Sequence, residues 1–165
     1  MTNGWLIPTV LVVAFAAIVA VLALRKRMRR NAMARVAKAL GLRYSAGDPL
    51  GLSRGLGADV SDTIWGRFEG ADIAIATASR SIVRPDSESW VTSSVGVSLK
   101  VKVVRGLEIA QQAAGPSAQV GLTTDGRLAV RSRIPNQRSA APVVQPEDLP
   151  TLLEATARAA RSQSW

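Results

Sequence analysis

The sequence predicts an α+β protein with one N-terminal transmembrane helix followed by a small domain that has an antiparallel sheet and a C-terminal helix. Three observations support this fold class. Residues 5–24 contain no charged side chain, residues 90–104 include a run of alternating apolar residues, and apolar residues between 147 and 160 recur at helical spacing. The remainder of the chain shows no internal repeat, so we expect a single domain over residues 44–165.

Residues 5–24 form the predicted transmembrane helix. Twelve of these twenty residues are Leu, Ile, Val or Phe, and a twenty-residue helix spans about 30 Å, the thickness of a bilayer's hydrocarbon core. A cleaved signal peptide would carry its cations before a shorter apolar run. Here the cations follow the run, so we expect an uncleaved signal anchor in a single-pass bacterial membrane protein.

A basic juxtamembrane helix is predicted over residues 25–43. Its first cations are Arg25, Lys26, Arg27, Arg29 and Arg30. The positive-inside rule places them in the cytoplasm, so residues 1–4 are extracytoplasmic and the C-terminal domain is cytoplasmic, at the cell (inner) membrane. We expect the five side chains to contact anionic headgroups at the membrane surface.

Small residues form a stripe on the predicted anchor. Ala16, Ala20 and Ala23 lie at helical spacing, which would allow a second helix to approach closely. They are candidates for a helix–helix contact, although alanine is abundant throughout this chain.

The charge distribution argues against nucleic-acid binding. The net charge is +9, but residues 25–43 contribute +8 and no acidic residue, which leaves the rest of the chain at +1. Nucleic-acid binding usually requires a basic patch on the domain itself, together with stacking aromatic residues. The chain has only seven aromatic residues. We therefore expect no nucleic-acid partner.

The absence of cysteine and histidine excludes several kinds of chemistry. Histidine-based triads cannot form, and zinc, haem and iron–sulfur centres lose their usual ligands. We therefore expect no metal, no cofactor and no enzymatic activity. Three pairs of acidic residues are close in sequence, and the expected place of each pair explains it structurally. Asp59/Asp62 precedes a strand, Asp86/Glu88 lies in a polar loop, and Glu147/Asp148 lies at a helix N-terminus, where acids complement the helix dipole.

The segment after the anchor is predicted to be helical over residues 31–42. Met33, Val36, Ala37 and Leu40 share one face, and Gly41 is a plausible stop. This helix either continues the membrane helix or packs on the domain. The glycine-rich residues 45–58 are predicted to form a loop, because Gly55 and Gly57 lack the third glycine of a dinucleotide-binding motif.

A hairpin is predicted next, with strands over 63–68 and 71–78 around the turn Glu69-Gly70. Residues 79–89 are polar and are predicted to be a connection. Trp65 and Trp90 alternate with apolar neighbours, so we expect both to be core residues.

The strand over 90–104 has the clearest alternation. One face carries Val95, Val97, Leu99, Val101 and Val103, whereas the other carries Gly96, Ser98, Lys100 and Lys102. This pattern predicts one buried and one solvated face of an antiparallel sheet.

A second hairpin over 118–134 turns at Thr124-Asp125-Gly126. A two-residue loop would place Arg131 on the apolar face. A three-residue loop with Gly126 in the left-handed region pairs Leu122 with Leu128 and Val120 with Val130 on one buried face. The second register is therefore predicted.

Three segments complete the chain. Residues 106–115 are compatible with a strand or a helix, and residues 135–145 have the composition of a linker. A final helix is predicted from Glu147 to Ala160, with Pro150 in its first turn. Its apolar face comprises Leu149, Leu152, Leu153, Thr156 and Ala160.

Several short motifs occur together. These are Ala-Leu-Gly-Leu-Arg-Tyr-Ser-Ala-Gly-Asp-Pro at 39–49, Ile-Trp-Gly-Arg-Phe-Glu-Gly at 64–70 and Pro-Glu-Asp-Leu-Pro-x-Leu-Leu at 146–153. Together they resemble an uncharacterised family of small membrane-anchored domains from high-GC Gram-positive bacteria. That resemblance implies no catalytic residue and no activity.

We therefore interpret the chain as a non-enzymatic, membrane-anchored binding or accessory protein at the cytoplasmic face. Its expected partners are a bilayer with anionic headgroups and a membrane or cytoplasmic protein. One alternative is a small accessory subunit held in a larger membrane complex through its transmembrane helix. The other is an enzyme that works without histidine and cysteine.

The predicted register gives a test of the second hairpin. Gly126→Ala should destabilise the domain by about 1 kcal/mol, because a Cβ is disfavoured in the left-handed region. Denaturant unfolding measures this change. A two-residue loop, or a negative φ at Gly126, would contradict the register.

Overall fold

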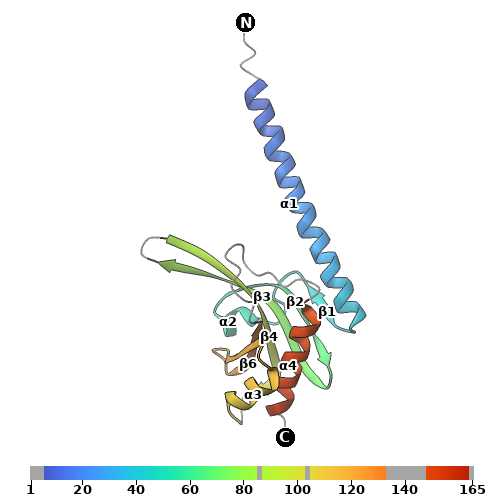
Figure 1. Cartoon of the computed structure of the whole chain (residues 1–165). Helices are drawn as coiled ribbons and strands as arrows, with labels where there is room; N and C mark the ends of the chain where they lie inside the picture. Colours follow the sequence, from blue (N-terminus) through green and yellow to red (C-terminus); the bar gives the residue numbers. More distant parts are fainter. Residues whose placement is uncertain (1–5, 85–86, 103–104, 133–147, 164–165) are drawn as a thin grey trace.

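The computed structural model describes residues 6–84, 87–102, 105–132 and 148–163, with side chains from residue 10 onward except at 82–91, 102 and 132. It has an α+β architecture, with a six-stranded antiparallel sheet in the order β1-β2-β3-β4-β6-β5. A single long helix projects from this domain (Figure 1). The predicted antiparallel sheet and C-terminal helix are thus confirmed.

The long helix α1 runs without a break over Leu6–Ala39. Its described residues up to Met28 are exposed, whereas Met33 and Ala37 are completely buried in the domain. The segment 31–42 therefore both continues the first helix and packs on the domain. Gly41 has φ 69°, and the amide of Leu42 donates to the Ala37 carbonyl at 2.8 Å, so the predicted stop is confirmed.

Within the described part of the chain, no helix combines the length and hydropathy that crossing a membrane requires.

Three strands form one side of the sheet: β1 (Arg43–Ser45), β2 (Asp59–Phe68) and β3 (Ala71–Arg84). The predicted turn Glu69-Gly70 joins β2 to β3, with positive φ at both residues as a tight hairpin turn requires. β2 contains a bulge, because its register with β3 shifts between Ser61 and Ile64.

The prediction that residues 79–89 form a polar connection is wrong. β3 continues to Arg84, and β4 (Ser87–Lys102) begins three residues later. Cross-strand pairing extends to Arg84↔Ser87, so the two strands form a long ribbon (Figure 1). The side chain of Trp90, and those of Asp86 and Glu88, lie outside the described residues.

Two hydrophobic clusters cover opposite faces of the sheet. The larger lies beneath the end of α1 and the helices α3 (Leu107–Ala114) and α4 (Leu149–Gln163), and it includes the buried residues Ile73 and Ile75. The smaller lies beneath the short helix α2 (Leu52–Leu56) and includes Ala74, Ala76, Val95 and Val97. Trp65 is partly buried against this smaller cluster.

The expected solvated face of β4 is in part wrong. Gly96 and Ser98 are buried, because α4 lies directly over them. A Cβ on Gly96 would be only 3.0 Å from the Cβ of Thr156, so glycine permits the close approach of the helix. Lys100, farther along the strand, is exposed and pairs with Asp72 at 2.5 Å.

The alternation of β4 also ends sooner than predicted. The register with β6 (Arg127–Ser132) shifts between Val97 and Lys102, and the amide of Val101 donates to the Ser98 hydroxyl at 3.1 Å. This bulge places Val101 against the larger cluster, whereas Leu99 packs on the smaller one. Val103 lies outside the described residues.

The predicted register of the second hairpin is confirmed. β5 (Ala118–Leu122) pairs with β6 through Val120↔Val130 and Leu122↔Leu128, and Gly126 has φ 80°. One expectation fails, because Leu122 is 51% exposed. It lies at the end of an edge strand, where no further strand covers it.

Gln111 of α3 covers the outer backbone of this edge strand. Its side chain donates to the Ala118 carbonyl at 2.8 Å and accepts from the Val120 amide at 2.9 Å. These bonds occupy the groups that would otherwise pair with a strand from another molecule.

The predicted loop at 45–58 contains a helix, α2. Asp48 accepts hydrogen bonds from the amides of Leu52 and Ser53, both at 2.8 Å. Burial of the Asp48 carboxyl opposes its ionisation, but these hydrogen bonds prevail and lower its pKa. The helix ends where Thr124 of the second hairpin donates to the Gly55 carbonyl.

The C-terminal helix is confirmed, and its predicted apolar face is buried. The ambiguous segment 106–115 contains the helix α3. The predicted linker over 135–145, and Glu147, lie outside the described residues.

The contact between Gly96 and Thr156 gives a test of the packing. Gly96→Ala should destabilise the domain by about 1–3 kcal/mol, because the added methyl overpacks the interface. Gly121→Ala is the matched control, since nothing lies within 4 Å of a Cβ at that strand position. Denaturant unfolding of the chain measures both, and Thr156→Ala should recover part of the loss in the double variant. Equal effects at the two glycines would contradict the close approach.

Candidate membrane-proximal site

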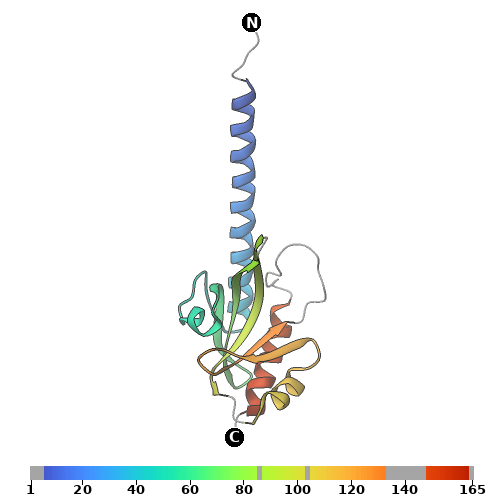
Figure 2. The same cartoon turned by 90° about the vertical axis from the view of Figure 1, so that its left-hand side faces the viewer.

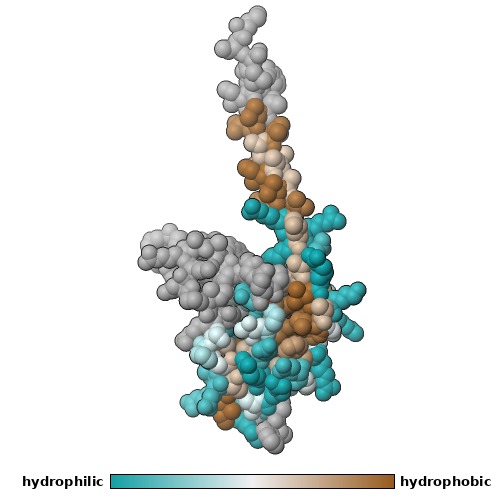
Figure 3. Space-filling model, turned by 45° about the vertical axis from the view of Figure 1, so that its right-hand side comes forward, coloured by the Kyte–Doolittle hydropathy of each residue, from teal (hydrophilic) through white to brown (hydrophobic). Residues whose placement is uncertain are grey.

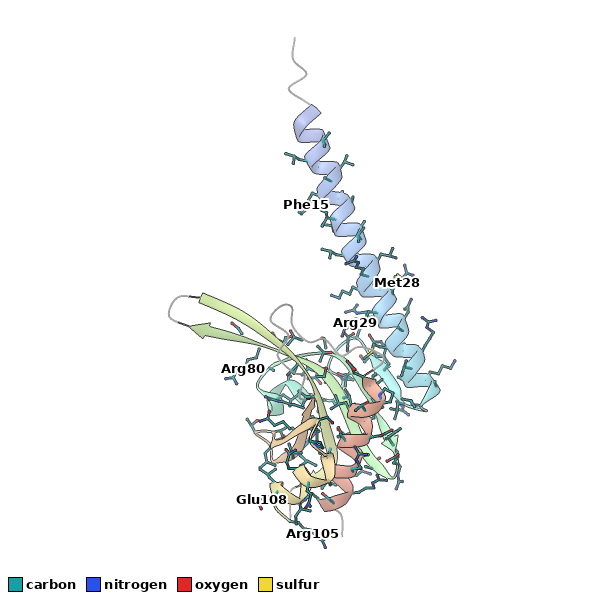
Figure 4. All side chains as sticks on the ribbon, viewed as in Figure 1. Phe15, Met28, Arg29, Arg80, Arg105 and Glu108 are labelled. Atoms are coloured by element: carbon teal, nitrogen blue, oxygen red, sulfur yellow. The ribbon has the colours of Figure 1, made fainter. Side chains whose placement is uncertain are left out.

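The candidate site lies where α1 meets the sheet. It comprises Arg29 and Arg30 of α1, Asp62 of β2 and Tyr44 of β1. Figure 4 shows Arg29 at the point where the helix reaches the domain. We refer to these four residues as the junction cluster.

The bulge in β2 places Asp62 at this junction. Asp62 has φ 50°, a left-handed conformation that Asp tolerates better than most residues. Its amide donates to the carbonyl of Ala46 at 3.3 Å. Its side chain is only 7% exposed, so the backbone holds a buried carboxylate beneath the helix.

Three groups surround that carboxylate. The Tyr44 hydroxyl donates to Oδ1 of Asp62 at 2.7 Å. Nη2 of Arg29 lies 3.4 Å from Oδ2, and Nε of Arg30 lies 3.7 Å from Oδ1. The two ion pairs therefore connect the helix α1 to the strand β2.

The cluster has more positive than negative charge. Two guanidinium groups face one carboxylate, and Nε and Nη2 of Arg29 and Nε of Arg30 are buried with no hydrogen-bond partner among the described residues. A buried carboxylate without its cations would be strongly destabilising. Burial of the Asp62 carboxylate therefore depends on Arg29 and Arg30 being held next to it by α1.

Tyr44 remains protonated in this environment. Burial raises the pKa of its hydroxyl, and the hydrogen bond to Asp62 and the charge of Asp62 raise it further. The charges of Arg30 and Arg29 oppose this shift only in part. Tyr44 is consequently a permanent donor to the carboxylate at neutral pH.

The five predicted headgroup-contacting cations divide into two groups. Arg25, Lys26 and Arg27 are exposed on α1. Arg29 and Arg30 are half-buried and paired with Asp62. The sequence did not reveal that Arg29 and Arg30 pair with a carboxylate, because Asp62 stood out there only as one member of the carboxylate pair Asp59/Asp62.

The predicted helix–helix residues Ala16, Ala20 and Ala23 lie on the exposed part of α1. Figure 3 shows this stretch standing clear of the domain as a largely apolar rod. None of the three takes part in the described hydrophobic clusters.

Other candidate chemistry is not brought together. Asp59 is exposed whereas Asp62 is buried, and the described residues contain no group of three potential metal ligands. A groove of about 230 Å³ lies between α2 and the second hairpin, with Gln119, Thr123 and Arg131 among its lining residues. It contains the side chain of only one charged residue, Arg131.

Comparison with known proteins gives no family, since no protein-family profile, no curated protein and no solved structure matches the chain.

The junction cluster predicts a loss of stability at alkaline pH. The folded state keeps the Tyr44 proton above the ordinary pKa of about 10, whereas the unfolded state loses it. The contribution of Tyr44 to the free energy of unfolding is thus complete below this ordinary pKa and falls as the pH rises above it. Because Tyr44 is the only tyrosine, the near-ultraviolet absorbance of tyrosinate reports its ionisation directly.

We expect tyrosinate to appear only when the chain unfolds. Tyr44→Phe should reduce the loss of unfolding free energy at alkaline pH. Asp59→Asn is the matched control, and it should change neither the onset of tyrosinate absorbance nor the pH dependence of the unfolding free energy. Ionisation of Tyr44 at its ordinary pKa in the folded chain would contradict the described environment.

Proposed function

We propose that this chain is a single-pass membrane protein whose N-terminal helix anchors a non-enzymatic binding or accessory domain at the cytoplasmic face. The observation that carries the proposal is the apolar surface of α1 directly followed by cations. Val12 is 68% exposed and Phe15 is 70% exposed, and every other described side chain from 10 to 24 is also exposed.

Such a surface needs a non-aqueous environment. Burial of apolar surface is favourable by about 25 cal/mol per Å², and contiguous exposed patches of this size mark interaction or membrane sites. In the sequence, the uncharged segment covers residues 5–24, which matches the thickness of a bilayer. A lipid bilayer is therefore the proposed environment of this helix.

The orientation follows from the cations beyond Leu24. Arg25, Lys26 and Arg27 remain exposed, so they are free to meet anionic headgroups, each with about 1 kcal/mol of attraction. The positive-inside rule then places the domain in the cytoplasm. The excess positive charge of the junction cluster lies on the same side.

A second candidate is an accessory subunit of a larger membrane complex. The observation that favours it is the stripe of Ala16, Ala20 and Ala23, which is exposed on the same segment of α1. Small residues at this spacing allow a partner helix to pack closely within the bilayer. Co-purification of a membrane protein in mild detergent, and its loss in Ala20→Leu, would favour this candidate over a solitary anchor.

Membrane integration is the test of the anchor. The full chain should remain in the membrane after alkaline carbonate extraction, and Val13→Arg combined with Ile18→Arg should release it, because each charge costs about 2.5–3.5 kcal/mol near the centre of a membrane helix. Ile109→Arg is the control, since Ile109 is a 45% exposed apolar residue on the domain. Release of the unaltered chain would overturn the anchor.

A reporter fused after Trp165 tests the orientation separately. An enzyme reporter that is active only in the cytoplasm should work, and one that requires the periplasm should not. The opposite result would reverse the orientation while leaving the anchor intact.

A further inference from the structure

The junction cluster contains arginine hydrogen-bond donors that the chain does not satisfy. Nε and Nη2 of Arg29 and Nε of Arg30 are buried and have no hydrogen-bond partner among the described residues. Buried polar groups in folded proteins nearly always have a partner, and each exception calls for an explanation such as a bound ion or a functional role. These donors are consequently available to a further acceptor.

Asp62 accepts only weakly from the two arginines. Its nearest partner is Tyr44, whose hydroxyl donates to Oδ1 at 2.7 Å. Nη2 of Arg29 lies 3.4 Å from Oδ2, and Nε of Arg30 lies 3.7 Å from Oδ1. A charge-assisted hydrogen bond between such groups is about 2.7–2.9 Å long. The carboxylate therefore holds two guanidinium groups close to each other while leaving their donors largely unused.

The two arginines are also accessible and carry excess charge. Their side chains are 27% and 38% exposed, and within the described part of the chain Asp62 is the acid that pairs with both of them. Two cations next to one carboxylate leave one positive charge in excess. An anion with a single charge would neutralise the cluster, and its oxygens would accept from the guanidinium groups.

A phosphate group has the chemistry that this arrangement requires. Its oxygens point in several directions, so one phosphate can accept from two guanidinium groups at once. The planar guanidinium also presents its donors as a fork that matches phosphate oxygens, which makes arginine the usual residue for phosphate recognition. A phosphodiester, moreover, carries the single negative charge that balances the cluster.

The level of the cluster along α1 agrees with a phosphate from a lipid headgroup. Figure 2 shows α1 as a straight rod that leaves the domain at one end. Arg29 lies five residues beyond Leu24, which is about 7–8 Å along a helix, and the headgroup layer extends about 5–7 Å beyond the hydrocarbon core. Helical side chains tilt toward the N-terminus of their helix, which here is the direction of the uncharged segment 5–24.

Arg29 and Arg30 differ from the cations that precede them on α1. Arg25, Lys26 and Arg27 are exposed, so their attraction to anions is diffuse and is screened by salt. The paired arginines are instead held next to Asp62 by the fold. Because they are already positioned, they lose little side-chain freedom when an anion binds.

We propose that Arg29 and Arg30, positioned by Asp62, bind one phosphate group at the junction of α1 and the sheet. The phosphate belongs either to an anionic lipid headgroup or to a free phosphate ion, and both sources present the same oxygens to the arginines. The lipid source rests on the proposed function, because it requires α1 to be embedded, whereas the binding chemistry does not.

NMR of the full-length, isotope-labelled chain in maltoside micelles tests this site, because the detergent contains no phosphate. The readout is the Nε–H signal of each arginine. Phosphatidylglycerol and inorganic phosphate are titrated separately, and zwitterionic phosphatidylcholine is the lipid control. We expect the signals of Arg29 and Arg30 to shift together and to saturate at one phosphate group per chain. At high salt their shifts should persist, whereas that of Arg25 should largely disappear.

Two substitutions separate a built site from diffuse attraction. Arg30→Lys keeps the charge but loses the fork, so it should weaken binding by about tenfold or more. Arg25→Lys is its matched control and should leave the apparent Kd unchanged. Asp62→Asn makes the cluster more positive, so diffuse attraction predicts tighter binding, whereas loss of the positioning carboxylate predicts weaker binding. Arg30→Lys decides the outcome alone if Asp62→Asn does not fold.

The outcomes distinguish the two phosphate sources and separate the site from the anchor. Saturation by phosphatidylglycerol alone would assign the lipid, and saturation by inorganic phosphate as well would show that the site also takes the free ion. A chain that carbonate releases from the membrane but that still binds inorganic phosphate would overturn the anchor and keep the site. Unchanged Arg29 and Arg30 signals with both probes, equal effects of Arg25→Lys and Arg30→Lys, or tighter binding by Asp62→Asn would overturn the site and leave the anchor intact.

Discussion

The continuity of α1 is the constraint on which the rest of the structure depends. One helix supplies both an exposed apolar segment and, nine residues later, part of the domain core. Its end, with Met33 and Ala37, closes the larger cluster next to α4. Separate elements joined by a loop would let the domain move independently, whereas a shared helix couples the position of the domain to the environment of its first turns.

The junction cluster reinforces that coupling through charge. Asp62 is buried and would be costly without a cation, and both of its cations come from α1. The basic segment therefore divides into two groups. Arg25, Lys26 and Arg27 are exposed on the helix, whereas Arg29 and Arg30 attach the helix to the sheet. A count of positive charges cannot separate these two groups, because they differ in how far along the helix each residue lies from the domain.

The sheet is covered on both faces, which explains why its strands differ from a simple alternating pattern. α4 packs so closely on β4 that only glycine fits at position 96, and a bulge transfers Val101 to the opposite cluster from Leu99. The edge strand β5 is protected by the Gln111 side chain. The close packing of α4 at Gly96, the bulge in β4 and the Gln111 side chain on β5 together shield this small sheet from water.

The sequence by itself determined the elements whose signals are local. The periodicity of α4, the turn at Glu69-Gly70 and the register around Gly126 follow from patterns within a few residues, and the structure confirms each of them. The tertiary structure alone decided what depends on distant partners. Ser98 is polar yet buried because α4 covers it, and residues 79–89 are polar yet paired because β3 and β4 support each other. The junction cluster joins residues more than thirty positions apart, and only the folded chain brings Asp62 beneath Arg29.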